Sequence, residues 1–486
     1  MRKIFVCDNI YDSEKREFYK GYVIVYRGVI TDIKKKTFLK DKELTGEVFN
    51  FGENYLIPGF VDAHTHLLQT EVRDNRIDLS NEKSKIDIIE RLKNYRGKII
   101  FAENFDESNT MENKFFSKAE MDTISKEKPV IIRRICGHIA FANSVALDIL
   151  AKYDYSIKSD HILKEEQVFN LDSIFEEDES VLEIHLKNAI KKAHSNGITA
   201  IGEFATPQHF KIYQKLAITG DLDLRVSLFL RHKHFDSLKN AQLFGEFGND
   251  FLKINGIKYF MDGSIGGYTA AMNFYYREKQ TRGVILIDNL RDLIKEPLEN
   301  NFQIAVHAIG DRAVGEVIKA YKEYTEINSN RLRIEHAEIL TEELINQIAD
   351  LGLVLVMQPN FVRNWDYGEN HMYDNNLGEY ARFNNRYADI IKKGIKLAFS
   401  SDSMPMSPLY GIKNIETFER ESQRIGYNDA IYCYTKGSAE AIRRYDIGEI
   451  KEGNKADFAI LDGTLSKLKM TILSGEVVFN EEDRER

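Results

Sequence analysis

The middle of this chain carries eight short apolar runs, and stretches with a helical pattern separate most of them. A strand followed by a helix, repeated along a chain, is typical of a parallel sheet. Eight such units are the signature of a closed barrel. The pattern therefore predicts an α/β protein built on a (β/α)8 TIM barrel, with strands at residues 59–66, 197–204, 224–230, 256–261, 302–308, 332–337, 353–358 and 395–400.

Both ends of the chain have a different pattern, that of short β-strands close together in the sequence. Two apolar runs on either side of Gly28 form a hairpin pattern, and similar short runs occur near the C-terminus. We therefore predict a small composite β-sandwich domain made of residues 1–57 plus 447–486. Residues 58–446 would form the barrel domain. Within it, residues 67–180 are predicted to be a lid-like insertion over the barrel mouth, because so long a connection does not stay structureless in a compact domain.

The composition excludes several kinds of partner. A net charge of −9 at pH 7 argues against a nucleic acid or an anionic membrane surface. No apolar run reaches membrane-spanning length, and the N-terminus meets Asp8 too early for a signal peptide. The three cysteines are far apart and form no Cys-x-x-Cys motif. We expect a soluble cytoplasmic protein that acts on a small molecule, and the sequence leaves open whether it forms a homo-oligomer.

The first apolar run ends in His64-Thr65-His66, directly after a turn at Pro58-Gly59. Side chains two positions apart on a strand point to the same face, so the strand presents both imidazoles together. Two neutral imidazoles at a strand end can chelate a metal ion. The alternative is that both are ordinary core histidines, and the ends of the other strands decide between the two interpretations.

Chemically active residues recur in the later strands, at Lys258, His307, His336 and Asp402. In TIM barrels the active site lies at the C-terminal ends of the strands. One face of the barrel would then carry four imidazoles, a lysine and a carboxylate, which is enough for one or two metal ions. Lys258 lies within an apolar strand, where a cation needs a partner or a chemical modification.

The combination and order of these motifs resemble those of the metal-dependent amidohydrolase superfamily, and most of all the branch that contains N-substituted formamide deformylase. The resemblance extends over nearly the whole chain and is highly specific, whereas a single His-x-His would be a weak signal. It rests on residues 58–66, 137–138 with 143–144, 258–264, 307–314, 333–337, 358–359, 401–402 and 448–462 with Gly475.

The resemblance implies one or two divalent metal ions, expected to be zinc. The ligands that it implies are His64, His66, Lys258, His307, His336 and Asp402. Lys258 would be carboxylated by carbon dioxide, so that its carbamate bridges the ions. Burial makes this chemically reasonable, because a buried lysine has a lowered pKa and a nucleophilic neutral amine. The alternative is an unmodified Lys258 that pairs with Asp262 in a site for one metal ion.

The resemblance also implies a hydrolase that cleaves a carbon–nitrogen bond of the amide type, other than a peptide bond. A metal-activated hydroxide would attack the amide carbon, since a metal ion lowers the pKa of bound water to about 7. Asp402 would accept the proton of the attacking water and pass it to the leaving nitrogen. Two alternatives remain. One is an ester, lactone or phosphotriester hydrolase or a deaminase with the same site, and the other is a non-catalytic ligand-binding relative, which the complete set of ligands disfavours.

Two further residues are predicted to contact the substrate. His138 follows Gly137 within the insertion, matches a Gly-His motif of the family, and is expected to line the pocket. Trp365, the only tryptophan, follows the seventh strand and would form a wall of the same pocket. A second His-x-His, at His232 and His234, is interpreted as a substrate contact or as plain surface.

Overall fold

The computed structural model describes residues 1–35, 45–135, 137, 139–153, 161–164, 166–324, 326–327, 329–367 and 370–484. The chain divides into two compact units. The larger unit consists of Met1–Leu67 and Lys187–Arg486, and the smaller one of Leu68–Leu186. Each unit has hydrophobic clusters of its own. Among these residues, no helix has the length and apolar character that crossing a membrane requires.

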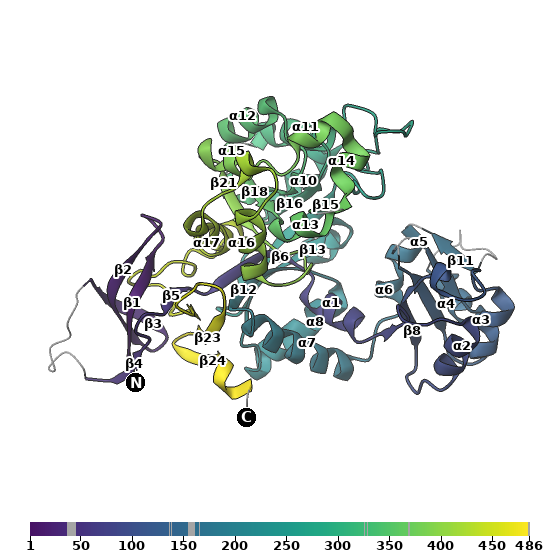
Figure 1. The fold of residues 1–486 in the computed structure, drawn as a ribbon, viewed down its shortest axis with the longest axis horizontal. Coiled ribbons are helices and arrows are strands. Elements are labelled where there is room, and N and C mark those ends of the chain that lie inside the picture. The colour runs from purple at the N-terminus through teal and green to yellow at the C-terminus, as the bar shows by residue number, and fades with distance from the viewer. Residues whose placement is uncertain are drawn as a thin grey trace. The chain divides into compact units, whose positions relative to one another are not determined.

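Eight parallel strands form the barrel of the larger unit (Figure 1). In sheet order they are β6 (Phe60–Thr65), β12 (Ile198–Ala205), β13 (Arg225–Arg231), β15 (Leu252–Phe260), β16 (Gln303–Ala308), β17 (Leu332–His336), β18 (Val354–Met357) and β21 (Lys396–Phe399). A short additional strand, β14 (Phe247–Gly248), pairs with β15 in the antiparallel direction. The eight parallel strands coincide with the eight predicted apolar runs, so the predicted barrel is confirmed.

Residues just beyond β21 close the barrel against its first strand, β6. The backbone N–H of Asp402 donates a hydrogen bond to the carbonyl oxygen of His64 at 3.0 Å. The backbone N–H of Ser401 donates to Oδ1 of Asp62 at 3.0 Å, and the Ser401 hydroxyl donates to the other oxygen of that carboxylate. Asp62 is only 1% exposed, so these bonds satisfy the oxygens of a buried carboxyl group. The closure places the loop after the last strand beside His64.

Helices separate the barrel strands and form an outer layer. They are α8 (Pro207–Thr219), α9 (Phe235–Asn240), α10 (Leu290–Glu299), α11 (Asp311–Tyr321), α12 (Glu342–Asp350), α13 (Pro359–Trp365), α14 (Met372–Leu377), α15 (Tyr387–Lys392), α16 (Pro408–Glu416), α17 (Tyr427–Tyr434) and α18 (Lys436–Ala441). In α8 the Thr206 side chain caps the first turn, Pro207 occupies the first position, and Gly220 ends the helix with a φ of 79°. Parallel strands covered in this way are buried on both faces, which explains their continuous apolar sequence.

Strands from both ends of the chain share one eight-stranded sheet. Its order is β24 (Glu476–Asn480), β23 (Leu468–Leu473), β22 (Phe458–Leu461), β5 (Tyr55–Pro58), β1 (Arg2–Asp12), β2 (Glu17–Tyr26) and β3 (Val29–Lys34), with β4 (Glu47–Asn50) also beside β1. Asp457, next to β22, forms a buried two-point ion pair with Arg225 of β13, at 2.7 and 3.0 Å. The contribution of both ends to one β-rich region is confirmed, whereas the domain boundaries at residues 57 and 447 stay a prediction.

The smaller unit contains a five-stranded sheet in the order β11 (Ile162–Lys164), β10 (Ile139–Ala142), β9 (Val130–Arg134), β8 (Ile100–Phe105) and β7 (Ile77–Asp78). Its chain also forms α1 (Leu67–Asp74), α2 (Lys85–Lys93), α3 (Lys118–Ile124), α4 (Ser144–Leu150), α5 (Glu166–Phe169) and α6 (Leu171–Ile174), and α7 (Glu179–His194) leads back into the larger unit. The insertion is therefore folded around clusters of its own. Its role as a lid over the barrel stays a prediction.

A buried carboxylate with three arginine partners stabilises the smaller unit. Oxygens of Asp172 lie 2.5 Å from Arg73 Nη2, 2.6 Å from Arg76 Nη1 and 3.0 Å from Arg133 Nη2. Burial alone would raise the pKa of Asp172, but the three guanidinium groups outweigh it and hold the pKa well below its usual value. The carboxylate is therefore ionised in the folded unit at neutral pH.

Candidate metal centre

The end of β6 and the loop after β21 bring two histidines and a carboxylate together. Oδ1 of Asp402 lies 3.3 Å from His66 Nε2 and 3.7 Å from His64 Nε2. His336, at the end of β17, also contributes, because one ligand atom each of His64, His336 and Asp402 lies within 4.8 Å of the others. Groups at this spacing can share one metal ion. The structure therefore gathers residues from three separate strand ends at one point.

His64 is oriented by two residues for which the sequence analysis gave no role. Its Nδ1 lies 2.6 Å from Oε2 of Glu335, and Arg333 holds Glu335 through contacts of 2.5 and 2.8 Å. All three side chains are buried. An acidic partner on one imidazole nitrogen directs the other nitrogen toward a metal ion. The sequence does contain one signal for this role. Arg333 and Glu335 are two positions apart, which puts both side chains on one face of the strand that ends at His336.

Two more histidines of the predicted set, His307 and His336, also have one ring nitrogen engaged. Nδ1 of His336 lies 2.8 Å from Oε1 of Gln358, and Nε2 of His307 lies 3.0 Å from the carbonyl oxygen of Gly263. The ring centroid of His336 is 4.5 Å from that of His307 and 5.1 Å from that of His64. A row of three imidazoles therefore crosses the strand ends, with Asp402 and His66 beside His64.

Two of the predicted ligands have left-handed backbone conformations. The φ angle is 72° at His336 and 47° at Asp402. A non-glycine residue with such a φ costs on the order of 1 kcal/mol, and tertiary contacts must hold it in place. At Asp402 one such contact is the hydrogen bond from its backbone N–H to His64. Both strand ends therefore turn sharply at the residue that carries the ligand.

Lys258 lies inside the barrel, close to aromatic side chains. Its side chain is 2% exposed, and Nζ forms no hydrogen bond with any residue that the structure describes. Nζ instead lies over the ring of Phe204, 4.4 Å from its centroid. Burial is the main reason why the pKa of Lys258 falls to about 8. Asp262, its alternative partner, accepts hydrogen bonds from three backbone N–H groups, those of Ala271, Ile309 and Gly310.

The chemistry of these groups fits a divalent metal ion. Burial lowers the pKa values of His64 and His336 well below normal and that of His307 to about 4, so the imidazoles are neutral. Burial alone would raise the pKa of Asp402, but His64, His66 and Lys258 outweigh it and lower the pKa to about 2. Neutral imidazoles and an ionised carboxylate are the forms that bind zinc. Lys258 is buried near them, and no residue that the structure describes forms a hydrogen bond with its Nζ.

The predicted substrate contacts are placed only in part. Trp365 ends α13, and its ring centroid is 4.5 Å from that of Phe361. The ring centroid of Phe361 is in turn 6.2 Å from that of His336. An aromatic row therefore connects Trp365 to the metal centre. His138 lies outside the described residues. His232 is exposed and stacks on Tyr259 at 5.1 Å, so the surface interpretation fits it.

The barrel and its ligand set define the class of this protein as a metal-dependent hydrolase. The chain belongs to the amidohydrolase family, which it matches over residues 47–479. The family resemblance seen in the motifs is thereby confirmed.

Individual relatives agree with this assignment. YtcJ of Bacillus subtilis (strain 168) is 28% identical over 94% of this chain and 96% of its own. N-substituted formamide deformylase of Arthrobacter pascens is 23% identical over 95% of this chain and 94% of its own. The crystal structure of an uncharacterized metal-dependent hydrolase from Pyrococcus furiosus is 26% identical, covers 95% of this chain and 99% of that one, and superposes with a TM-score of 0.83.

Proposed function

We propose that this protein hydrolyses an amide-type carbon–nitrogen bond, other than a peptide bond, in a small molecule. The observation that carries the proposal is the position of Asp402, 3.3 Å from His66 and 3.7 Å from His64. There its carboxylate can serve both as a ligand and in proton transfer. The similarity to an N-substituted formamide deformylase supports the choice of an amide.

We propose that the site holds one or two zinc ions. The residues that would hold them are His64, His66, His307, His336, Asp402 and a carboxylated Lys258. When bound, such an ion lowers the pKa of a coordinated water to about 7 and polarises the substrate carbonyl. Glu335 would keep Nδ1 of His64 engaged, so that Nε2 is left for the metal.

Asp402 would move the proton that amide hydrolysis requires. With a pKa lowered to about 2, its carboxylate is ionised at neutral pH and can accept the proton of the attacking water. It would then protonate the departing nitrogen. An amine leaves an acyl carbon only when it is protonated, whereas an alcohol has less need of such help. A positioned proton carrier therefore favours amides over esters.

Carboxylation would turn the buried Lys258 side chain from a cation into an anion. With a pKa of about 8, about a tenth of these side chains are neutral at pH 7, far more than for an ordinary lysine. The neutral Nζ would form a bond to the carbon of carbon dioxide and lose one proton to solvent. The resulting carbamate has two oxygens with one negative charge. Such a group is a hard ligand suited to the ions that imidazole and carboxylate bind.

The test combines metal analysis with a substrate panel. Purified protein is assayed for zinc and then supplied with N-formyl and N-acyl amines and with esters of the same acids. We expect bound zinc and turnover of members of the amide series, at a higher kcat/KM than for the matched esters. Turnover of esters or lactones without any amide would contradict the proposed bond type, and release of ammonia from an aminated ring would indicate a deaminase.

A further inference from the structure

A second group of metal-ligating side chains lies beyond the metal centre of the barrel. Asp366 of β19 (Asp366–Tyr367) is paired in register with His371 of β20 (Asn370–His371) in a two-stranded antiparallel ribbon. Residues directly opposite each other in such a ribbon present their side chains on the same face, with Cβ atoms about 5 Å apart. Asp374 follows in α14, and its Oδ2 lies 3.8 Å from Nδ1 of His371.

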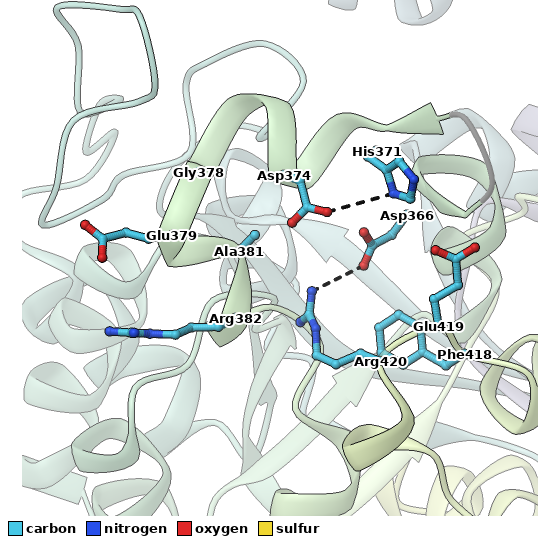
Figure 2. A pocket seen from close by; sticks show the side chains of 10 residues that line it. All are labelled: Asp366, His371, Asp374, Gly378, Glu379, Ala381, Arg382, Phe418, Glu419 and Arg420. Carbon is cyan, nitrogen blue, oxygen red and sulfur yellow. Dashed lines mark ion pairs between the residues drawn. The ribbon is translucent and has the colours of Figure 1, made fainter.

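These three side chains converge. One ligand atom each of Asp366, His371 and Asp374 lies within 4.8 Å of the others. Figure 2 shows the two carboxylates and the imidazole facing one another, while Glu379 of the same pocket points away from them. An imidazole nitrogen and two carboxylate groups form a donor set that suits a divalent ion of intermediate softness, such as zinc.

The group is separate from the ligands of the barrel. α13 begins at Pro359, directly after Gln358, the partner of His336, and it ends at Trp365. A helix of that length spans about 10 Å, so Asp366 follows at the far end of α13 from the metal centre. The two groups have no residue in common.

Asp366 gives an independent reason to expect a cation. The residue is 5% exposed, and its Oδ2 accepts no hydrogen bond from any of the residues described. Arg420 is near, but its Nη2 is 3.6 Å from Oδ2, beyond hydrogen-bonding distance. Buried carboxylates are ordinarily satisfied by close donors. A bound ion would supply the close positive partner that is missing.

The surrounding pocket has room and the right charge. Its volume is about 390 Å³, which can accommodate an ion with water or a small oxygen ligand beside it. The lining includes four acidic residues, Asp366, Asp374, Glu379 and Glu419, against two basic ones, Arg382 and Arg420. The acidic excess favours a cation over an anion at this place.

We propose that Asp366, His371 and Asp374 bind a divalent ion of the zinc class at a second site of this protein. The imidazole distinguishes the site from one for calcium or magnesium, which prefer oxygen ligands alone. Water or a small molecule in the pocket would complete the coordination. This inference concerns side chains outside the barrel centre and does not depend on the reaction proposed above.

The first test measures zinc content in the full-length protein, equilibrated with excess Zn²⁺ and then freed of unbound ions. We expect His371→Ala and Asp374→Asn each to hold one Zn²⁺ fewer per chain than the wild type. When the variants are titrated with Zn²⁺, the ion that they lack should bind with an affinity more than about tenfold lower than in the wild type. Glu379→Gln is the matched control, since it removes a carboxylate from the same pocket and should retain the wild-type zinc content.

A second measurement needs no variant. Anomalous diffraction at the zinc edge from wild-type crystals grown with Zn²⁺ should give a peak between Asp366, His371 and Asp374. The side chains of His371 and Asp374 are 38% and 56% exposed, so their replacement should leave the fold intact. Equal zinc content in the wild type and both variants, or anomalous peaks at the barrel ligands alone, would overturn the proposal.

Discussion

Oε2 of Glu335 lies 2.6 Å from Nδ1 of His64, although 271 positions separate the two residues in the chain. Both side chains are buried, and Arg333 donates hydrogen bonds to both oxygens of the Glu335 carboxylate. The contact leaves Nε2 of His64 on the side of Asp402. Glu335 therefore positions a predicted metal ligand without belonging to the predicted ligand set.

Replacing Glu335 by Gln should weaken zinc binding by about 10- to 100-fold, because partners of metal-bound histidines commonly contribute that much. Gln keeps the shape of the side chain but removes the charge that favours an N–H at Nδ1 of His64. Zinc affinity is measured by competition with a chelator. Glu343→Gln, at an exposed carboxylate on α12, is the control and should bind zinc as the wild type does. Unchanged affinity in Glu335→Gln would show that the contact has no orienting role.

Lys258 should carry a carbamate in the metal-loaded protein. Protein equilibrated with ¹³C-bicarbonate should show one carbamate carbon by nuclear magnetic resonance, because the buried amine is partly neutral and no described residue forms a hydrogen bond with it. The signal should be missing in Lys258→Arg and present in Lys253→Arg, which changes a lysine near the other end of β15. A wild-type protein with full zinc occupancy and no carbamate signal would rule the modification out.

Asp402→Asn should lower kcat by about 100- to 10,000-fold, the usual contribution of a positioned acid–base group. The asparagine can still contact the histidines but cannot accept the proton of the attacking water. Unfolding temperature and circular dichroism check that the variant folds. Asp350→Asn, at an exposed position on α12, should have wild-type turnover. A kcat of Asp402→Asn within a few fold of the wild type would exclude the proposed role.

Asp172→Asn should destabilise the smaller unit by about 3–5 kcal/mol at pH 7, because three arginines would lose their buried anionic partner. The folded-state pKa of Asp172 lies below its unfolded value of about 4. Its contribution is therefore complete above pH 4 and is lost as the pH falls below that value. The difference between variant and wild type should stay constant from pH 7 to 5 and shrink below pH 4.

Hydrogen exchange in β8 and β9 measures this effect within the smaller unit. The control is Asp178→Asn, which removes an ion pair with Lys98 whose side chains are 55% and 80% exposed. An exposed pair contributes less than about 1 kcal/mol, so this variant should exchange almost as the wild type does. Equal exchange in both variants at pH 7 would mean that the buried network adds nothing to stability.

The sequence by itself determined the barrel, and it predicted the positions of the main candidate ligands. Burial on both faces makes a parallel strand apolar along its length, so each strand is visible in its own residues. The spacing of His64 and His66 places both on one face of a strand, and a barrel brings all strand ends to one rim. These inferences need only local patterns and one rule of topology. The predicted role of His138 stays a prediction, because His138 lies outside the described residues. The predicted role of the insertion as a lid stays a prediction as well.

Only the tertiary structure decided which side chains face one another. His371 carried no signal in the sequence, yet strand pairing sets it opposite Asp366 and near Asp374. In the same way, barrel closure brings Asp402 to His64, and neighbouring strands bring Glu335 to it. Among the described residues none forms a hydrogen bond with Lys258 Nζ, whereas three backbone N–H groups donate to Asp262, its alternative partner. Contacts of this kind depend on strand register and loop conformation, which arise from packing over the whole unit and not from neighbouring residues.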